Sequence, residues 1–85
     1  MVKFNYVIKD ALGIHARPAG LLVKEAAKLG SKITIKKGEK SGDAKKIFGI
    51  MGLGVKQNDE VVIEVEGNTE QEDAEVIKAF FENNL

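Results

Sequence analysis

The chain has 85 residues, which is enough for one small domain around a single hydrophobic core. Thirteen lysines and arginines balance thirteen aspartates and glutamates, and this zero net charge argues against a general nucleic-acid binder. The absence of cysteine excludes disulfides, zinc–thiolate sites and cysteine nucleophiles, and a small domain without such links favours the cytoplasm. No apolar run approaches the ~20 residues of a membrane span, so we expect no membrane insertion. The N-terminal residues 1–5 lack the apolar stretch of a signal peptide.

The first thirty residues predict a strand, a loop and a helix. Apolar and polar residues alternate from residue 2 to residue 8, which is typical of a half-buried strand. A loop follows at residues 10–13. Residues 16–29 then place apolar side chains on one face of a helix, and Gly30 fits the position just past its end. The side chains expected inside are Val2, Phe4, Tyr6, Ile8, Ala19, Leu22, Val23, Ala26 and Leu29.

The middle of the chain predicts three strands and a short apolar segment. A strand is expected over residues 32–37, and Gly38 permits a tight turn into a weaker strand at 40–43. The apolar segment, at residues 47–53, is treated as a short helix. Residues 61–66 alternate as a fourth strand. The side chains expected inside these strands are Ile33, Ile35, Val61, Ile63 and Val65.

The last predicted element is a helix that begins after Thr69. Thr69 and Glu72 form a capping-box pattern there, and the buried stripe consists of Ala74, Ile77, Phe80 and Phe81. Acidic residues in its first turns complement the helix dipole and need no catalytic or metal-binding role. The resulting order, βαββαβα, predicts an α+β fold in one domain spanning residues 1–85. One face of its sheet is covered by helices and the other is exposed to solvent.

The only histidine, arginine and proline of the chain fall within four residues, as His15, Arg17 and Pro18, at the start of the first helix. Helix N-termini expose unpaired amides and favour anions, and the amides of Ala16 and Arg17 stay available to a ligand. The Arg17 guanidinium suits forked recognition of phosphate. An imidazole is a nucleophile near neutral pH, so His15 could accept a phosphoryl group. Small Ala16 and Gly20 would leave the ring accessible.

Other interpretations of these residues remain open at this point. His15 could be a polar cap and Arg17 a solvated surface residue. A general-base role for His15 is weaker, because no Ser, Cys or Asp is placed by sequence as its partner. A metal site is weaker still, because one histidine without cysteine supplies too few nitrogen or sulfur ligands.

The apolar segment near residue 50 offers a second candidate site. On a helix, Ile50 and Leu53 share one face, Ile47 and Met51 share another, and Phe48 lies apart from both. One face can enter the core while part of Ile47, Phe48 and Met51 forms an exposed partner surface, and complete burial of all three is equally consistent with the sequence. Residues 49–52 also match the GxxG of KH-type RNA binders, but their central residues are apolar rather than basic.

Two segments resemble the signatures of a known family. Residues 13–19 (GIHARPA) are similar to the active-site signature of HPr, the phosphocarrier of the bacterial phosphoenolpyruvate:sugar phosphotransferase system, and residues 46–54 (KIFGIMGLG) resemble its second signature. The resemblance covers essentially the whole chain. It implies an open-faced β-sandwich, with four antiparallel strands and three helices on one face. It also implies that His15 takes a phosphoryl group on Nδ1 from enzyme I and passes it to a sugar-specific enzyme IIA, with Arg17 as phosphate ligand.

The resemblance further implies a docking surface and one departure from the family pattern. The docking surface maps onto Ala16, Arg17, Gly20, Lys24, Ala27, Ile47, Phe48 and Met51. The family typically has a serine, phosphorylated by a dedicated kinase, where this chain has Lys46, so the regulatory serine is absent. Leu12 also replaces a small polar residue that many relatives carry, which bears on how the His15 loop is capped.

The sequence therefore predicts a cytoplasmic phosphoryl carrier that is a substrate of its partner enzymes rather than an enzyme. We expect it to be a monomer, to need no metal or organic cofactor, and to bind neither nucleic acid nor membranes. Two alternatives stay open. One is a regulatory paralogue in a nitrogen-related relay, and the other is a non-phosphorylated protein-binding regulator on the same fold.

Overall fold

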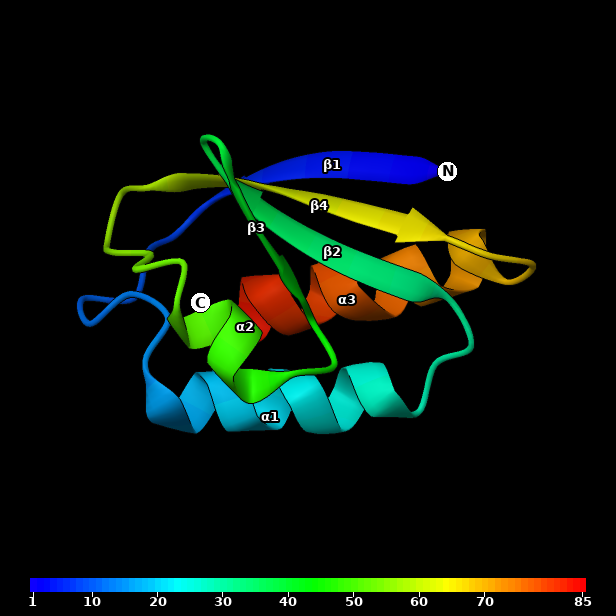
Figure 1. Ribbon diagram of the computed structural model, residues 1–85, viewed down its shortest axis with the longest axis horizontal. Coiled ribbons are helices and arrows are strands. Elements are labelled where there is room, and N and C mark those ends of the chain that lie inside the picture. The colour runs from blue at the N-terminus through cyan, green and yellow to red at the C-terminus, as the bar shows by residue number, and fades with distance from the viewer.

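All 85 residues are described by the computed structural model, and their helices and strands are arranged in two layers (Figure 1). The order is β1 (Val2–Val7), α1 (Ala16–Ala27), β2 (Lys32–Lys37), β3 (Lys40–Asp43), α2 (Ile47–Met51), β4 (Glu60–Glu66) and α3 (Glu70–Asn84). The strands form one antiparallel sheet in the order β1-β4-β2-β3. All three helices cover the same face of this sheet. The predicted open-faced β-sandwich is thus confirmed.

The two central strands carry the inner face of the sheet. Ile33 and Ile35 of β2 lie opposite Val65 and Ile63 of β4, and all four side chains are fully buried. Strand β1 lies at the edge of the sheet, so its inward residues Val2, Phe4 and Tyr6 are only half-buried against the core. The alternation seen in the sequence therefore gives the right face of β1, β2 and β4, with the deepest burial at the centre.

The helices close the core from one side. Nineteen buried apolar residues form a single cluster, to which α1 contributes Ala19, Leu22 and Ala26. The predicted stripe of α3 is buried as expected, and the ring of Phe81 packs edge-on against Tyr6 with centroids 5.5 Å apart. Full burial of an Ile, Leu or Phe side chain contributes about 1.5–3 kcal/mol, so this cluster is the main source of stability. None of the three helices has the length and apolar character needed to cross a membrane.

Three local predictions need correction. Helix α1 ends at Ala27, and Gly30 does not adopt the left-handed backbone of a helix-terminating glycine. Helix α2 ends at Met51 rather than at residue 53, although Leu53 is still buried. The Thr69–Glu72 capping box does not form, because the Thr69 hydroxyl donates to Asp73 instead. The tight turn at Gly38 is confirmed by its positive φ of 58°.

Candidate functional site

The loop before α1 is fixed on both sides of His15. Gly13 has φ +67°, and a Cβ at this position would lie 2.2 Å from the Val55 carbonyl oxygen, so only glycine fits. The Ile14 N–H donates to the same carbonyl at 3.1 Å, and the Ile14 side chain is buried. These contacts hold the start of α1 against the segment that follows α2.

His15 is the N-cap residue of α1. Its backbone is extended, its carbonyl accepts the first helical hydrogen bond from the Ala19 N–H at 2.9 Å, and its side chain makes no capping bond. The amides of Ala16 and Arg17 have no partner inside the helix, as at any helix start. The imidazole is therefore free of a capping role, which overturns the interpretation of His15 as a polar cap.

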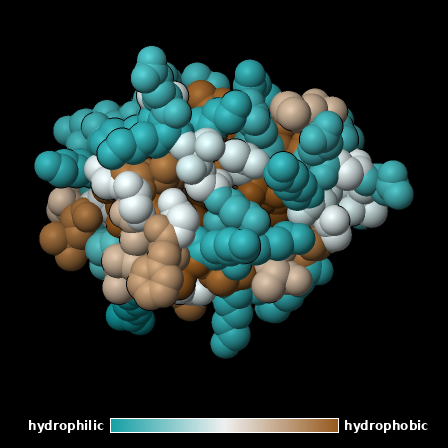
Figure 2. Space-filling model, viewed as in Figure 1, coloured by the Kyte–Doolittle hydropathy of each residue, from teal (hydrophilic) through white to brown (hydrophobic).

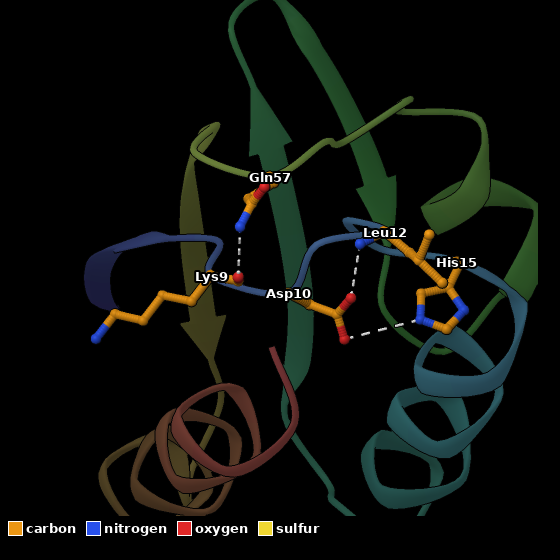
Figure 3. Close-up of polar contacts among 5 residues, drawn as sticks. All are labelled: Lys9, Asp10, Leu12, His15 and Gln57. Carbon is orange, nitrogen blue, oxygen red and sulfur yellow. Dashed lines mark hydrogen bonds and ion pairs between the residues drawn. The ribbon is translucent and has the colours of Figure 1, made fainter.

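Asp10 is the residue that sequence reasoning missed. Its Oδ2 lies 3.8 Å from His15 Nε2, and its Oδ1 accepts a hydrogen bond from the Leu12 N–H at 2.8 Å (Figure 3). No motif in the sequence places an aspartate beside His15. A local signal existed only for the turn itself, because an aspartate three residues before a turn glycine often folds its side chain back onto the backbone two residues on.

One pocket brings these groups together. Asp10, His15, Arg17, Pro18, Leu21 and Asn84 line a pocket of about 300 Å³ at the N-terminus of α1. The predicted pair, His15 and Arg17, therefore shares one space, in which an imidazole, a guanidinium and the helix amides can meet a single anion. His15 is about one-third exposed, at 35%, so a partner can reach the ring. The pocket therefore combines a histidine with an arginine and helix amides, which are groups that suit an anion.

The predicted docking surface lies on α1 and α2. Phe48 is 86% exposed and Met51 is 38% exposed, whereas Ile50 between them is buried. The alternative in which Ile47, Phe48 and Met51 are all buried is therefore wrong. Figure 2 shows apolar side chains at the surface over the region of α2. The other members are exposed at Ala16, Arg17, Lys24 and Ala27 and half-buried at Gly20 and Ile47.

Helices α1 and α2 meet at this surface, and Lys46 stands at its edge. Ile47 Cδ1 lies 3.9 Å from where a Cβ of residue 20 would be, which is an ordinary van der Waals distance, so the two helices come close at Gly20 without requiring glycine there. Lys46 is the exposed N-cap residue of α2, and its side chain makes no capping bond. The Leu12 side chain is 72% exposed, and its loop is held by the Asp10 carboxylate, which accepts a hydrogen bond from the Leu12 N–H.

Comparison with known proteins agrees with this geometry. The family model "PTS HPr component phosphorylation site" matches residues 2–83. The phosphocarrier protein HPr of Mycoplasma genitalium is 42% identical over 85 residues, which cover 99% of this chain and 97% of the relative. HPr of Mycoplasma capricolum is 42% identical over 78 residues, or 92% of this chain and 88% of the relative. A solved mycoplasma histidine-containing phosphocarrier protein superposes with a TM-score of 0.93 at 39% identity, covering 96% of this chain and 93% of that one.

The chain belongs to the HPr family, the phosphocarriers of the phosphotransferase system. The predicted family and the phosphocarrier function are thereby confirmed. The pocket at the start of α1 contains the only histidine of the chain.

Proposed function

We propose that this protein takes a phosphoryl group onto Nδ1 of His15 from enzyme I and passes it to a sugar-specific enzyme IIA. The observation that carries the proposal is the position of the single histidine, one-third exposed at the N-cap of α1, in one pocket with Arg17. Nε2 faces Asp10, which leaves Nδ1 as the ring nitrogen available to phosphorus. The Arg17 guanidinium and the helix amides then neutralise the incoming charge.

In this relay the protein is a substrate rather than an enzyme. The lone pair of Nδ1 forms a bond to phosphorus, while the bond between phosphorus and its leaving group on enzyme I breaks and leaves its electron pair there. On transfer to enzyme IIA, an acceptor group of that enzyme forms a bond to phosphorus, and the bond from phosphorus to Nδ1 breaks and returns its electron pair to the ring. We propose that residues 1–85 act as one such carrier domain, as a monomer and in the cytoplasm. Light scattering at increasing concentration tests the monomer, and a mass of two chains would contradict it.

The His15→Ala variant tests this function directly. After incubation with enzyme I and phosphoenolpyruvate, mass spectrometry should find one acid-labile phosphate on the wild type and none on the variant. The fold should survive, because the His15 side chain makes no capping bond and lies outside the core. Equal phosphorylation of both proteins, with matching denaturation midpoints, would refute the assignment.

We further propose that serine-linked control does not act at the start of α2. The side chain at that position is Lys46, whose ammonium group cannot accept a phosphoryl ester and has the opposite charge. Incubation with a family serine kinase and ATP should add no mass to the wild type, and Lys46→Ser is the variant expected to gain it. Stoichiometric phosphorylation of the wild type on any serine would restore the regulatory role.

A further inference from the structure

Asp10 is held in place more firmly than a surface loop residue needs to be. Its N–H donates to the Leu85 carbonyl at 2.9 Å, and its own carbonyl accepts from the Gly13 N–H at 2.9 Å. Its Oδ1 accepts from the Leu12 N–H at 2.8 Å. Three hydrogen bonds thus fix both the backbone and one carboxylate oxygen.

The neighbouring residue is fixed in the same way. The Lys9 N–H donates to the Leu85 carbonyl, and the Lys9 carbonyl accepts from Gln57 Nε2 at 3.1 Å (Figure 3). The loop is therefore tied to two segments that are far from it in sequence. Its position does not depend on His15, so the carboxylate is already in place before any ligand arrives.

The other carboxylate oxygen of Asp10, Oδ2, faces the imidazole of His15. It lies 3.8 Å from His15 Nε2, and both side chains are about one-third exposed, at 35% for His15 and 30% for Asp10. This distance exceeds a hydrogen bond, and such contacts in unliganded sites often tighten when the reacting group binds. The other charged group of the pocket is Arg17, from α1.

We propose that Asp10 is a positioning residue that holds the proton of His15 on Nε2 and keeps the lone pair of Nδ1 free for phosphorus. A neutral imidazole donates from one nitrogen and accepts at the other, and a carboxylate beside Nε2 favours the proton there. This inference rests on the proposed phosphoryl transfer through Nδ1 and names the group that prepares it.

The step balances without another reactant. The Nδ1 lone pair forms the nitrogen–phosphorus bond, and the bond from phosphorus to the donor breaks with its electron pair on the donor. The proton stays on Nε2, so the ring carries positive charge as the bond forms. The Asp10 carboxylate stabilises that charge from the side opposite to the phosphoryl group, much as a carboxylate steadies the histidine of a hydrolase triad.

The Asp10→Asn variant separates this role from the role of the loop. An asparagine side-chain oxygen can still accept from the Leu12 N–H, but it carries no charge toward His15. We expect phosphoryl transfer from enzyme I to slow by about tenfold, a small effect for a positioning group because solvent partly screens the pair. The denaturation midpoint should stay close to that of the wild type.

A second readout uses the protein alone. Nitrogen-15 NMR of the imidazole reports which ring nitrogen carries the proton, and the wild type should show the Nε2–H form in clear excess. In Asp10→Asn this excess should fall. The matched control is Asp43→Asn, since Asp43 Oδ1 accepts from the Lys45 N–H at 2.9 Å in the same type of turn with no histidine beside it. Lys45 Nζ donates to the Leu29 carbonyl, which places that turn near the far end of α1.

The outcomes distinguish this inference from the proposed function. The role of Asp10 would be overturned if Asp10→Asn transferred phosphate as fast as the wild type. It would also be overturned if transfer slowed while the imidazole proton stayed on the same nitrogen. Either result would leave His15 as the carrier. Equal slowing in Asp43→Asn would also overturn the role of Asp10. A wild type that accepts no phosphate would instead defeat the proposed function, whatever the NMR spectra show of Asp10.

Discussion

One aspartate lies near each end of α1, Asp10 in the loop before this helix and Asp73 on α3, and their carboxylates have different surroundings. Near the N-terminus, Asp10 is one-third exposed and directs one carboxylate oxygen toward His15. Beyond the C-terminus, Asp73 is buried, and its Oδ2 accepts from the Ser31 hydroxyl at 2.6 Å, the Ser31 N–H at 3.2 Å and the Thr69 hydroxyl at 2.8 Å. Asp10 Oδ2 faces the His15 ring, whereas Asp73 Oδ2 accepts three hydrogen bonds.

This difference is visible in the electrostatics of Asp73. The hydrogen bond from the Ser31 hydroxyl, helped by those from Thr69 and the Ser31 N–H, holds the pKa of the Asp73 carboxyl below its usual value. Burial works in the other direction and is outweighed. The hydrogen bonds from Ser31 to this buried carboxylate tie α3 to the loop before β2. We therefore expect changes at Asp73 to alter stability, and changes around His15 to alter transfer.

The largest expected effect concerns Asp73 and the stability of the fold. Asp73→Ala removes the acceptor of three hydrogen bonds and leaves the buried Ser31 hydroxyl without its partner, so unfolding should become easier by about 3 kcal/mol. Phosphorylation of the folded variant by enzyme I should be unchanged. Urea denaturation measures the first quantity and mass spectrometry the second. Glu72→Ala, an exposed neighbour, is the matched control and should stay within about 0.5 kcal/mol.

The second prediction concerns Arg17 and phosphoryl transfer at the start of α1. Arg17→Ala should slow phosphoryl transfer by about 100-fold, because a preorganised donor to the developing charge is lost. Its stability should change by less than ~1 kcal/mol, since Arg17 is exposed. Quenched-flow kinetics with enzyme I measures the rate. Lys28→Ala, an exposed cation at the other end of α1, serves as control, and equal slowing there would show a general charge effect rather than a phosphate contact.

The sequence predicted some parts of this molecule well because their causes are local. Alternation placed Ile33, Ile35 and Ile63 inside, since the period of a strand is set by the backbone itself. The motif around His15 located the start of α1, because helix periodicity acts within a few residues.

Other parts depend on contacts between distant residues and could not be predicted. Asp10 lies beside His15 because its N–H donates to Leu85 and because the nearby Gly13 packs against Val55, and both partners are far away in the sequence. The capping box failed because Thr69 bonds the carboxylate that also holds Ser31, which lies 42 residues from Asp73. In both cases a tertiary contact decides between local alternatives of similar energy.

The third prediction separates surface from core within α2. Phe48→Ala should weaken binding to enzyme I by about 1–2 kcal/mol, because an exposed aromatic ring on the docking surface loses its contacts. Its own stability should fall only modestly. Ile50→Ala is the matched variant, because the loss of this buried side chain should lower the stability by about 2–5 kcal/mol. Titration calorimetry and urea midpoints together decide, and a large stability loss in Phe48→Ala with intact affinity would remove it from the docking surface.

The smallest expected effect concerns how the hydrogen bonds to Asp73 contribute to stability as the pH falls. Thr69→Ala removes one of the three hydrogen bonds to Asp73 Oδ2 and should cost about 1 kcal/mol near neutral pH. The folded pKa of Asp73 lies below that of the unfolded chain, so the stability that it contributes is present above about pH 4 and is lost as the pH falls through the folded value. The difference between wild type and Thr69→Ala should therefore shrink in acid.

The comparison between the two proteins isolates Asp73 from other acid-sensitive groups. Asp59 also has its pKa held low, mainly by a hydrogen bond from Lys37, but it is unchanged in both proteins and its contribution cancels. Urea midpoints measured from pH 7 down to about pH 3 would show the trend, with the exposed Asn68→Ala as a neighbour that should give no pH-dependent difference. A Thr69→Ala difference that stays constant over this range would mean that the hydroxyl acts without the Asp73 charge. The contrast between the two aspartates would then rest on burial alone.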